Sequence, residues 1–232
     1  MFIGVVGATG RIGSRVVTEA LDRGHHVIAF TRDLDRAETT HPNLTWKTLD
    51  IFDSTAVAAA LPGLDVLVSC YQPGNAARDF DDTVARSIAD PTVYATAARS
   101  LLRALATHPR TRLIVVGGAG SLEREPGLVA ADAPDLEDSL ERIGIPREYA
   151  VAVHGHREAL NVLRTSNRHW TYFSPAAEIA PGERTGRFRI GTDRQIVDAA
   201  GRSRISMEDA AVALIDEAEL PRFVQRRFTV GY

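Results

Sequence analysis

Short apolar runs alternate with longer segments of helical periodicity over the first two thirds of the chain. The short runs have the length of buried strands, and in the longer segments apolar residues recur every three or four positions. This alternation indicates βαβ units. We therefore predict an α/β fold with a doubly wound, mostly parallel sheet and helices on both faces. The predicted strands are 2–6, 26–31, 44–49, 64–69, 112–116 and 169–173, and the predicted helices run from the turn 7–13 to about 23 and over about 54–61, 91–106 and 147–164.

Several predicted helices carry end signals. Gly24 follows the first helix at the position where left-handed backbone favours glycine. Ser54 is the predicted N-cap of the second helix, and Asp90 before Pro91 that of the third. Beyond residue 173 the pattern predicts one further helix near 207–218, with short strands near 188–190, 203–205 and 222–230.

Two segments, 121–146 and about 175–206, interrupt the alternation. Both begin where a predicted strand ends, and ligands of open α/β sheets bind outside the carboxyl ends of the strands. We interpret them as a small substrate-facing lobe, the alternative being plain surface loops. Because no interdomain linker is evident, residues 1–232 are predicted to form one domain.

A glycine-rich turn follows the first predicted strand. It reads Gly7-Ala8-Thr9-Gly10-Arg11-Ile12-Gly13 and opens an amphipathic helix. Gly7 permits a tight turn, Gly10 lets the backbone approach a pyrophosphate, and Gly13 allows close packing of helix on strand. The helix N-terminus presents free N–H groups to the phosphates. These features predict a Rossmann-type dinucleotide site that includes Gly7, Ala8, Thr9, Gly10, Arg11 and Ile12.

The end of the second strand bears on the choice of dinucleotide. An acid there would bind the ribose 2′-hydroxyl of NAD, whereas an arginine suits the 2′-phosphate of NADP. Arg32 follows the strand directly, and Arg11 or Arg36 could add a second guanidinium. Asp33 and Asp35 keep the NAD reading open, but NADP(H) is favoured over NAD(H).

Residues after the other strands complete the predicted cofactor site. Asp50 follows the third strand, where a carboxylate could meet the adenine amino group, and Asp53 is an alternative that could instead cap the next helix. Cys70 and Tyr71 follow the fourth strand and are expected beside the riboses. The remaining predicted cofactor contacts are Ile51, Gly117, Gly118 and Pro175.

Four stretches together resemble a known family. They are the turn 7–13 and the segments 115–122, 170–177 and 181–186. The chain resembles, over nearly its whole length, the atypical short-chain dehydrogenases of the NAD(P)H-binding group. That group includes NADH-flavin reductases and relatives of the nitrogen-metabolite-repression regulators. The resemblance implies the Rossmann fold and the nicotinamide cofactor, but it leaves the substrate open.

The resemblance also implies catalytic candidates. Ser121 resembles the serine that faces the nicotinamide in related reductases. The Tyr-x-x-x-Lys pair of ordinary short-chain dehydrogenases is incomplete, because Val153 stands four residues after Tyr149. A second alignment places His154 at the lysine position, and His156 is a weaker candidate. The predicted catalytic residues are therefore Ser121, His154 and Tyr149.

The incomplete pair affects the expected reaction. Carbonyl reduction needs a positioned acid for the developing alkoxide, whereas a flavin or quinone can take protons from water. We therefore expect an NADPH-dependent reductase that acts on a flavin- or quinone-like acceptor. A non-catalytic sensor of NADP(H) and an isomerase-type enzyme remain alternatives.

The composition limits the expected binding partners, cellular location and metal content of the protein. The net charge of −3 gives no reason to expect nucleic acid or an anionic membrane as partner. The lone cysteine, Cys70, cannot form an internal disulfide, which favours a cytoplasmic location. Neither a secretory signal nor an apolar run of about 20 residues is recognisable. Histidines and acids show no zinc-site spacing, so no metal is predicted.

Overall fold

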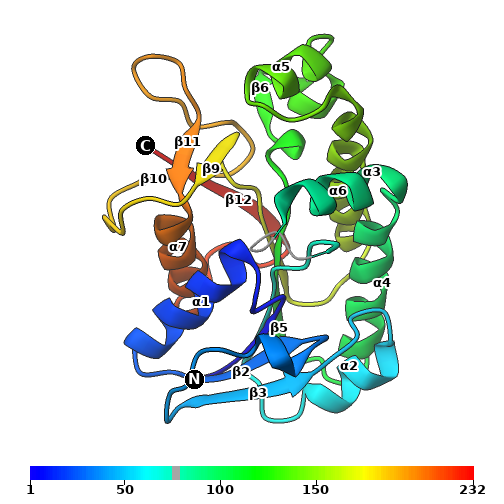
Figure 1. The fold of residues 1–232 in the computed structure, drawn as a ribbon, viewed down its shortest axis with the longest axis vertical. Coiled ribbons are helices and arrows are strands. Elements are labelled where there is room, and N and C mark those ends of the chain that lie inside the picture. Colours follow the sequence, from blue (N-terminus) through cyan, green and yellow to red (C-terminus); the bar gives the residue numbers. More distant parts are fainter. Residues whose placement is uncertain (75–78) are drawn as a thin grey trace.

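The central element of the structure is an eight-stranded sheet with strand order β10-β12-β8-β5-β4-β1-β2-β3 (Figure 1). The computed structural model describes residues 1–74 and 79–232. Every neighbouring pair in the sheet is parallel except β10 with β12. The strands are β1 (Phe2–Val6), β2 (His26–Thr31), β3 (Leu44–Thr48), β4 (Val66–Ser69), β5 (Arg112–Val116), β8 (Trp170–Phe173), β10 (Arg189–Gly191) and β12 (Arg226–Gly231).

Helices cover both faces of this sheet. Helices α1 (Arg11–Asp22) and α7 (Met207–Glu219) pack together on one face. Helices α2 (Ser54–Ala60), α4 (Val93–Leu105) and α6 (Ala150–Arg164) form the layer on the other, and α3 (Phe80–Ala89) packs beside α6 (Figure 1). The predicted fold class, doubly wound and mostly parallel, is confirmed.

Side chains of β1 alternate between two apolar cores. Val5 belongs to the core beneath α1 and α7, and Val6 to the core beneath α2, α4 and α6. Successive residues of a strand point to opposite faces, and both faces here are covered. This is why β1, β4 and β5 are near-continuous apolar runs in the sequence.

The helix-end predictions had mixed outcomes. Gly24 has φ +78° after α1, as predicted. The prediction that Ser54 caps α2 was wrong. The N-cap is Asp53, whose carboxylate accepts the N–H groups of Thr55 and Ala56. A carboxylate also complements the positive end of the helix dipole better than a hydroxyl.

The helix predicted over 91–106 begins later than expected and has an unpredicted neighbour. Asp90 does not cap the first turn of α4; its carboxylate accepts the N–H of Thr92, and α4 starts at Val93. The preceding α3 begins after Asp79, whose side chain accepts the N–H of Asp82. Similarly, the last strand starts at Arg226 instead of near residue 222.

The two irregular segments contain short elements and are bonded to each other. The N–H of Glu123 donates to the Asp193 carbonyl at 2.8 Å, and the N–H of Gln195 donates to the Glu123 carbonyl at 2.9 Å. Both segments lie in the upper half of Figure 1. Their elements are β6 (Glu123–Glu125), β7 (Leu128–Val129), α5 (Leu136–Arg142), β9 (Glu178–Ala180) and β11 (Arg204–Ser206). Single-turn 3₁₀ helices are η1 (Leu34–Arg36), η2 (Ala119–Ser121), η3 (Ala130–Asp132) and η4 (Arg147–Tyr149).

Among the described residues, none of the helices has the length and apolarity that crossing a membrane requires. The cytoplasmic location stays a prediction.

Candidate cofactor and acceptor site

The glycine turn lies at the topological switch point of the sheet, where the strand order reverses. The chain continues from β1 to β2 on one side and later returns to β4 on the other. Gly7 has φ +73°, and a Cβ there would come within 2.6 Å of the Cys70 carbonyl oxygen. A Cβ on Gly13 would lie 2.1 Å from the Gly7 carbonyl oxygen. Only glycine satisfies either position, so α1 starts unusually close to the ends of β1 and β4.

The turn points the first amides of α1 at this switch point. The N–H of Gly10 donates to the Gly7 carbonyl at 2.9 Å, which closes the turn. The N–H groups of the first helical turn have no carbonyl four residues earlier to bond, so they can bind an anion. Nearby, Ala8 is buried and its N–H bonds the Phe30 carbonyl. The geometry fits a pyrophosphate.

Of the predicted arginines, Arg11 lies in the turn at the start of α1, and Arg32 directly follows β2. Arg32 is exposed, and its Nη2 donates to the Gly74 carbonyl at 3.0 Å. The Arg11 guanidinium lies 5.3 Å from the centre of the Phe80 ring. Arg36 instead pairs with Asp33 at 3.1 Å, and Asp33 also accepts the N–H of Asp35.

The end of β3 supplies Asp50, whose exposed carboxylate accepts the N–H of Phe52 at 2.9 Å. Ile51 is buried beneath it in the core. The Phe52 ring meets Tyr71 edge-on, with 5.4 Å between ring centres. An aromatic wall therefore connects the ends of β3 and β4.

Of the two residues after β4, Cys70 is buried and Tyr71 is half-buried, and both are uncharged at neutral pH. Burial raises the pKa of the Cys70 thiol to about 12, and burial likewise raises the pKa of Tyr71 to about 12. A thiol in this environment is inert as a nucleophile. Cys70 thus contributes its backbone, packed against Gly7, and Tyr71 contributes a neutral phenol.

Two serines meet where the neighbouring strands β5 and β8 end. The Ser121 Oγ lies 2.7 Å from the Ser174 Oγ, and both side chains are buried. Ser121 also donates to the Gly118 carbonyl at 3.4 Å. Ser174 was not among the predicted site residues, although it directly follows a strand and precedes the buried Pro175. The structure therefore adds a second hydroxyl to the predicted one.

The glycines after β5 make room for two rings. A Cβ on Gly117 would overlap the phenol of Tyr172, whose hydroxyl donates to the His156 carbonyl at 2.8 Å. A Cβ on Gly118 would lie 3.3 Å from the His156 ring. Packing alone thus accounts for both glycines, and contact with the cofactor stays a prediction.

The histidine and tyrosine candidates of α6 lie in different environments. His154 is exposed. His156 is buried, 3.7 Å from Tyr94 between ring centres, and its Nε2 is 3.5 Å from the Gln72 amide nitrogen. Burial lowers the pKa of His156 to about 4, so the imidazole is neutral at pH 7. His156, the weaker sequence candidate, is therefore the histidine that lies near the ends of β4 and β5.

Tyr149 packs in the same cluster as Tyr94. Burial raises the pKa of Tyr149, and the nearby hydroxyls of Tyr94 and Ser87 oppose that shift. The Tyr94 hydroxyl itself is bonded to Ser87 and Gln72. The structure brings Tyr149 and His156 to Tyr94 and leaves His154 outside this group.

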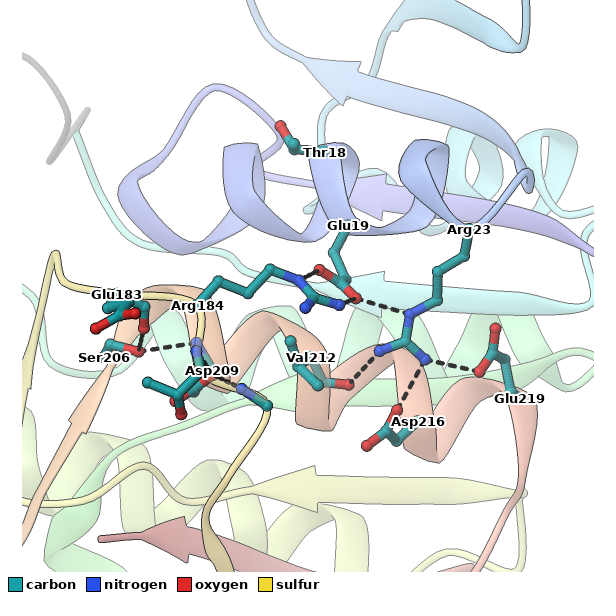
Figure 2. Close-up of polar contacts among 12 residues, drawn as sticks. Thr18, Glu19, Arg23, Glu183, Arg184, Ser206, Asp209, Val212, Asp216 and Glu219 are labelled. Atoms are coloured by element: carbon teal, nitrogen blue, oxygen red, sulfur yellow. Dashed lines mark hydrogen bonds and ion pairs between the residues drawn. The ribbon is translucent and has the colours of Figure 1, made fainter.

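Residues 182–186 of the second irregular segment are attached to both α1 and α7 (Figure 2). Arg184 donates to the Glu19 carboxylate through Nε at 2.7 Å and Nη2 at 2.8 Å, and Arg23 donates to it at 2.7 Å. Asp209 of α7 accepts the N–H groups of Thr185 and Gly186. The helix that begins at the glycine turn therefore also anchors segment 175–206.

Among the described residues, His, Cys, Asp and Glu side chains form no group of three that could hold a metal ion. The site is built from backbone amides, arginines, hydroxyls and aromatic rings.

Comparison with known proteins assigns the chain to a family. The protein YwnB of Bacillus subtilis (strain 168) is 35% identical over 234 residues, which cover 99% of this chain and 98% of YwnB. A Burkholderia pseudomallei structure named a putative exported protein has TM-score 0.81 and 39% identity, with full coverage of both chains. A putative NADH-flavin reductase from Streptococcus pneumoniae TIGR4 has TM-score 0.80 and 27% identity over 100% of this chain and 99% of that chain.

A family model described as NAD(P)H-binding matches residues 7–218, from the glycine turn almost to the end of α7. The matched region contains the glycine turn and both irregular segments, 121–146 and 175–206. The chain belongs to the NAD(P)H-binding family of oxidoreductase-type Rossmann proteins.

Proposed function

We propose that this protein is an NADPH-dependent reductase whose acceptor is a flat flavin- or quinone-like molecule. The observation that carries the proposal is the glycine turn at the β1–β4 switch point, where side chains on Gly7 and Gly13 are excluded and α1 begins without a side-chain cap. The first amides of α1 would hold the pyrophosphate, Arg11 and Arg32 the 2′-phosphate, and Asp50 the adenine. When bound, the reduced nicotinamide supplies a hydride.

The surroundings of Arg32 support NADP(H) over NAD(H). Arg32 is exposed, and among the described residues its hydrogen bond goes to the backbone carbonyl of Gly74, so its charge is not neutralised by that partner. The nearest acid along the chain, Asp33, is occupied by Arg36 and by the N–H of Asp35. A 2′-phosphate would meet a cation, and a ribose hydroxyl would find the closest carboxylate already engaged.

The proton-donating groups support the acceptor class. The sequence contains a single lysine, Lys47, which is exposed on the edge strand β3, so a Tyr–Lys pair cannot form. Burial raises the pKa of Tyr149, which makes its phenol a weaker acid, and His156 is neutral. A carbonyl acceptor would lack a strong acid, whereas reduced flavins and quinones take protons from water.

The test is turnover of purified protein with NADPH and a panel of free flavins, quinones and aldehydes, followed by the loss of reduced-nicotinamide absorbance. We expect oxidation with a flavin or quinone and none with aldehydes. Ser121→Ala should lower kcat by about tenfold or more, while Ser54→Ala, at the start of α2, should not. Turnover confined to aldehydes would contradict the proposal.

The same preparation tests the cofactor. Arg32→Glu should raise the Kd for NADPH and leave the Kd for NADH nearly unchanged, so that the preference reverses. Lys47→Glu places the same charge change on the neighbouring strand and is the matched control. An unchanged ratio of the two Kd values in Arg32→Glu would remove the assignment of NADP(H).

A second candidate function is a non-catalytic sensor of NADP(H). The burial of the Ser121–Ser174 pair favours it, because each hydroxyl is 2.7 Å from the other and little exposed to an acceptor. Tight NADPH binding without turnover, combined with very different affinities for oxidised and reduced cofactor, would select this function over the reductase.

A further inference from the structure

Arg227 places a charged guanidinium among the buried residues of strand β12. Its neighbours Phe228 and Val230 are core residues, yet Arg227 is itself only 7% exposed. An unpaired buried charge is strongly unfavourable, so the arginine must be compensated by partners. Those partners show what the residue does.

The partners come from both acceptor-facing segments. Nη1 of Arg227 donates to the carbonyl of Ser121, at the end of η2. Nη2 donates to the Asp193 carboxylate at 2.5 Å and to the Asp193 carbonyl at 3.4 Å. One buried side chain thus bridges segment 121–146 and segment 175–206.

Backbone bonds reinforce the same junction. Glu123 exchanges two hydrogen bonds with the chain at Asp193 and Gln195. Arg227 lies beside this pairing, because it bonds Asp193 on one side and Ser121, two residues before Glu123, on the other. Sequence separations of 106 and 34 residues make the bridge invisible to local patterns.

The bridge bears directly on the predicted hydroxyl. The Ser121 backbone is held by Arg227, and its Oγ is held by Ser174 at 2.7 Å. Loss of the first contact would free the backbone of η2, and the hydroxyl would move with it. Catalytic groups displaced by about 1 Å commonly lose large factors in rate.

We propose that Arg227 is a positioning residue, which sets the place of the Ser121 hydroxyl and locks the two acceptor-facing segments together. Its catalytic consequence rests on the proposed reductase function, whereas the locking of the segments does not. The planar guanidinium serves both partners at once, which a lysine ammonium cannot do with the same geometry.

The experiment uses the full chain with Arg227→Met and Arg227→Lys, and Arg226→Met as the matched control. Arg226 is the adjacent arginine of β12 and is exposed. Hydrogen–deuterium exchange is measured by peptide, and NADPH oxidation is measured with the best acceptor of the panel. Binding of NADPH is titrated separately.

For Arg227→Met we expect faster exchange in residues 119–129 and 189–196, with residues 7–20 unchanged. The kcat should fall by about tenfold or more, with the Kd for NADPH within about twofold of the wild type because the glycine turn is untouched. Arg227→Lys should show a smaller effect in both measurements. Arg226→Met should match the wild type.

The outcomes separate the two proposals. If the wild type turns over no acceptor, the reductase function fails, and exchange alone decides the role of Arg227. Unchanged exchange in both segments of folded Arg227→Met overturns the inference, and so does unchanged kcat in an active enzyme. If Arg227→Met does not fold, Asp193→Ala removes the exposed side-chain partner of Arg227, and wild-type exchange over 189–196 in that variant overturns the inference.

Discussion

The carboxylate of Glu19 offers the most direct test of how segment 175–206 is attached to the rest of the fold. Its side chain is 4% exposed and accepts three charge-assisted hydrogen bonds, two from Arg184 and one from Arg23. Glu19→Gln keeps the shape but removes the charge between two guanidinium groups. Each such bond contributes about 1.5–3 kcal/mol when buried.

Two features of the structure reduce that sum. Arg184 is 54% exposed, so water screens its attraction to Glu19, and Arg23 keeps Asp216 and Glu219 as partners at 2.8 Å. We therefore expect Glu19→Gln to lower the free energy of unfolding by about 2–3 kcal/mol at neutral pH. Arg184→Met should cost about 1 kcal/mol.

The dependence on pH follows from the same contacts. Hydrogen bonds from Arg184 hold the pKa of Glu19 below its ordinary value of 4.5, against the effect of burial, which raises it. Because the carboxyl is more acidic in the folded protein, its contribution is present above pH 4.5 and is lost as the pH falls through the folded value. The difference between wild type and Glu19→Gln should therefore shrink below pH 4.5.

Urea unfolding at several pH values measures this difference, with Asp22→Asn as the control on the exposed face of α1. A double-mutant cycle with Arg184→Met isolates the pair and should give a coupling of about 1 kcal/mol. If Glu19→Gln is as stable as the wild type at neutral pH, the buried ion pair does not hold the segment, and the reasoning fails.

Two further predictions concern the site itself. Gly13→Ala places a Cβ 2.1 Å from the Gly7 carbonyl oxygen, so it should cost about 2–3 kcal/mol of stability and abolish NADPH binding. Urea unfolding and cofactor titration measure the two effects, with the exposed Ser14→Ala as the control. Wild-type affinity for NADPH in Gly13→Ala would contradict the packing argument. Burial lowers the pKa of His156 to about 4, so the unfolded chain binds the proton more tightly and stability should fall as the pH drops from 6.5 towards 4. Between pH 7 and pH 5 the free energy of unfolding of the wild type should therefore fall by about 2 kcal/mol more than that of His156→Phe. The exposed His154→Gln is the control. Equal losses in wild type and His156→Phe would refute the burial of a neutral imidazole.

Much of the fold could be predicted because its signals are local. A strand with both faces buried is an apolar run, an amphipathic helix repeats its apolar residues every three or four positions, and Gly24 marks a left-handed turn. The doubly wound sheet followed from these patterns. Errors occurred where neighbouring residues compete for one role, as when Asp53 capped α2 in place of Ser54.

The glycine turn belongs to the same class of local signals. Its spacing predicts a close approach of backbone segments, and the structure shows carbonyl oxygens where a Cβ of Gly7 or Gly13 would stand. A phosphate cradle made of backbone atoms needs no particular partner from elsewhere in the chain. For this reason the geometry of the turn could be predicted from residues 7–13.

The acceptor side depended on contacts between distant residues. Ser174 and Arg227 bond Ser121 from 53 and 106 residues away in the sequence. Arg184 bonds Glu19 from 165 residues away. The sequence itself determined the strands, most helices and the backbone cradle, because each arises from the preferences of a few adjacent residues. Only the tertiary structure decided which hydroxyl, guanidinium or imidazole meets which partner, because side-chain hydrogen bonds are set by the packing of whole elements.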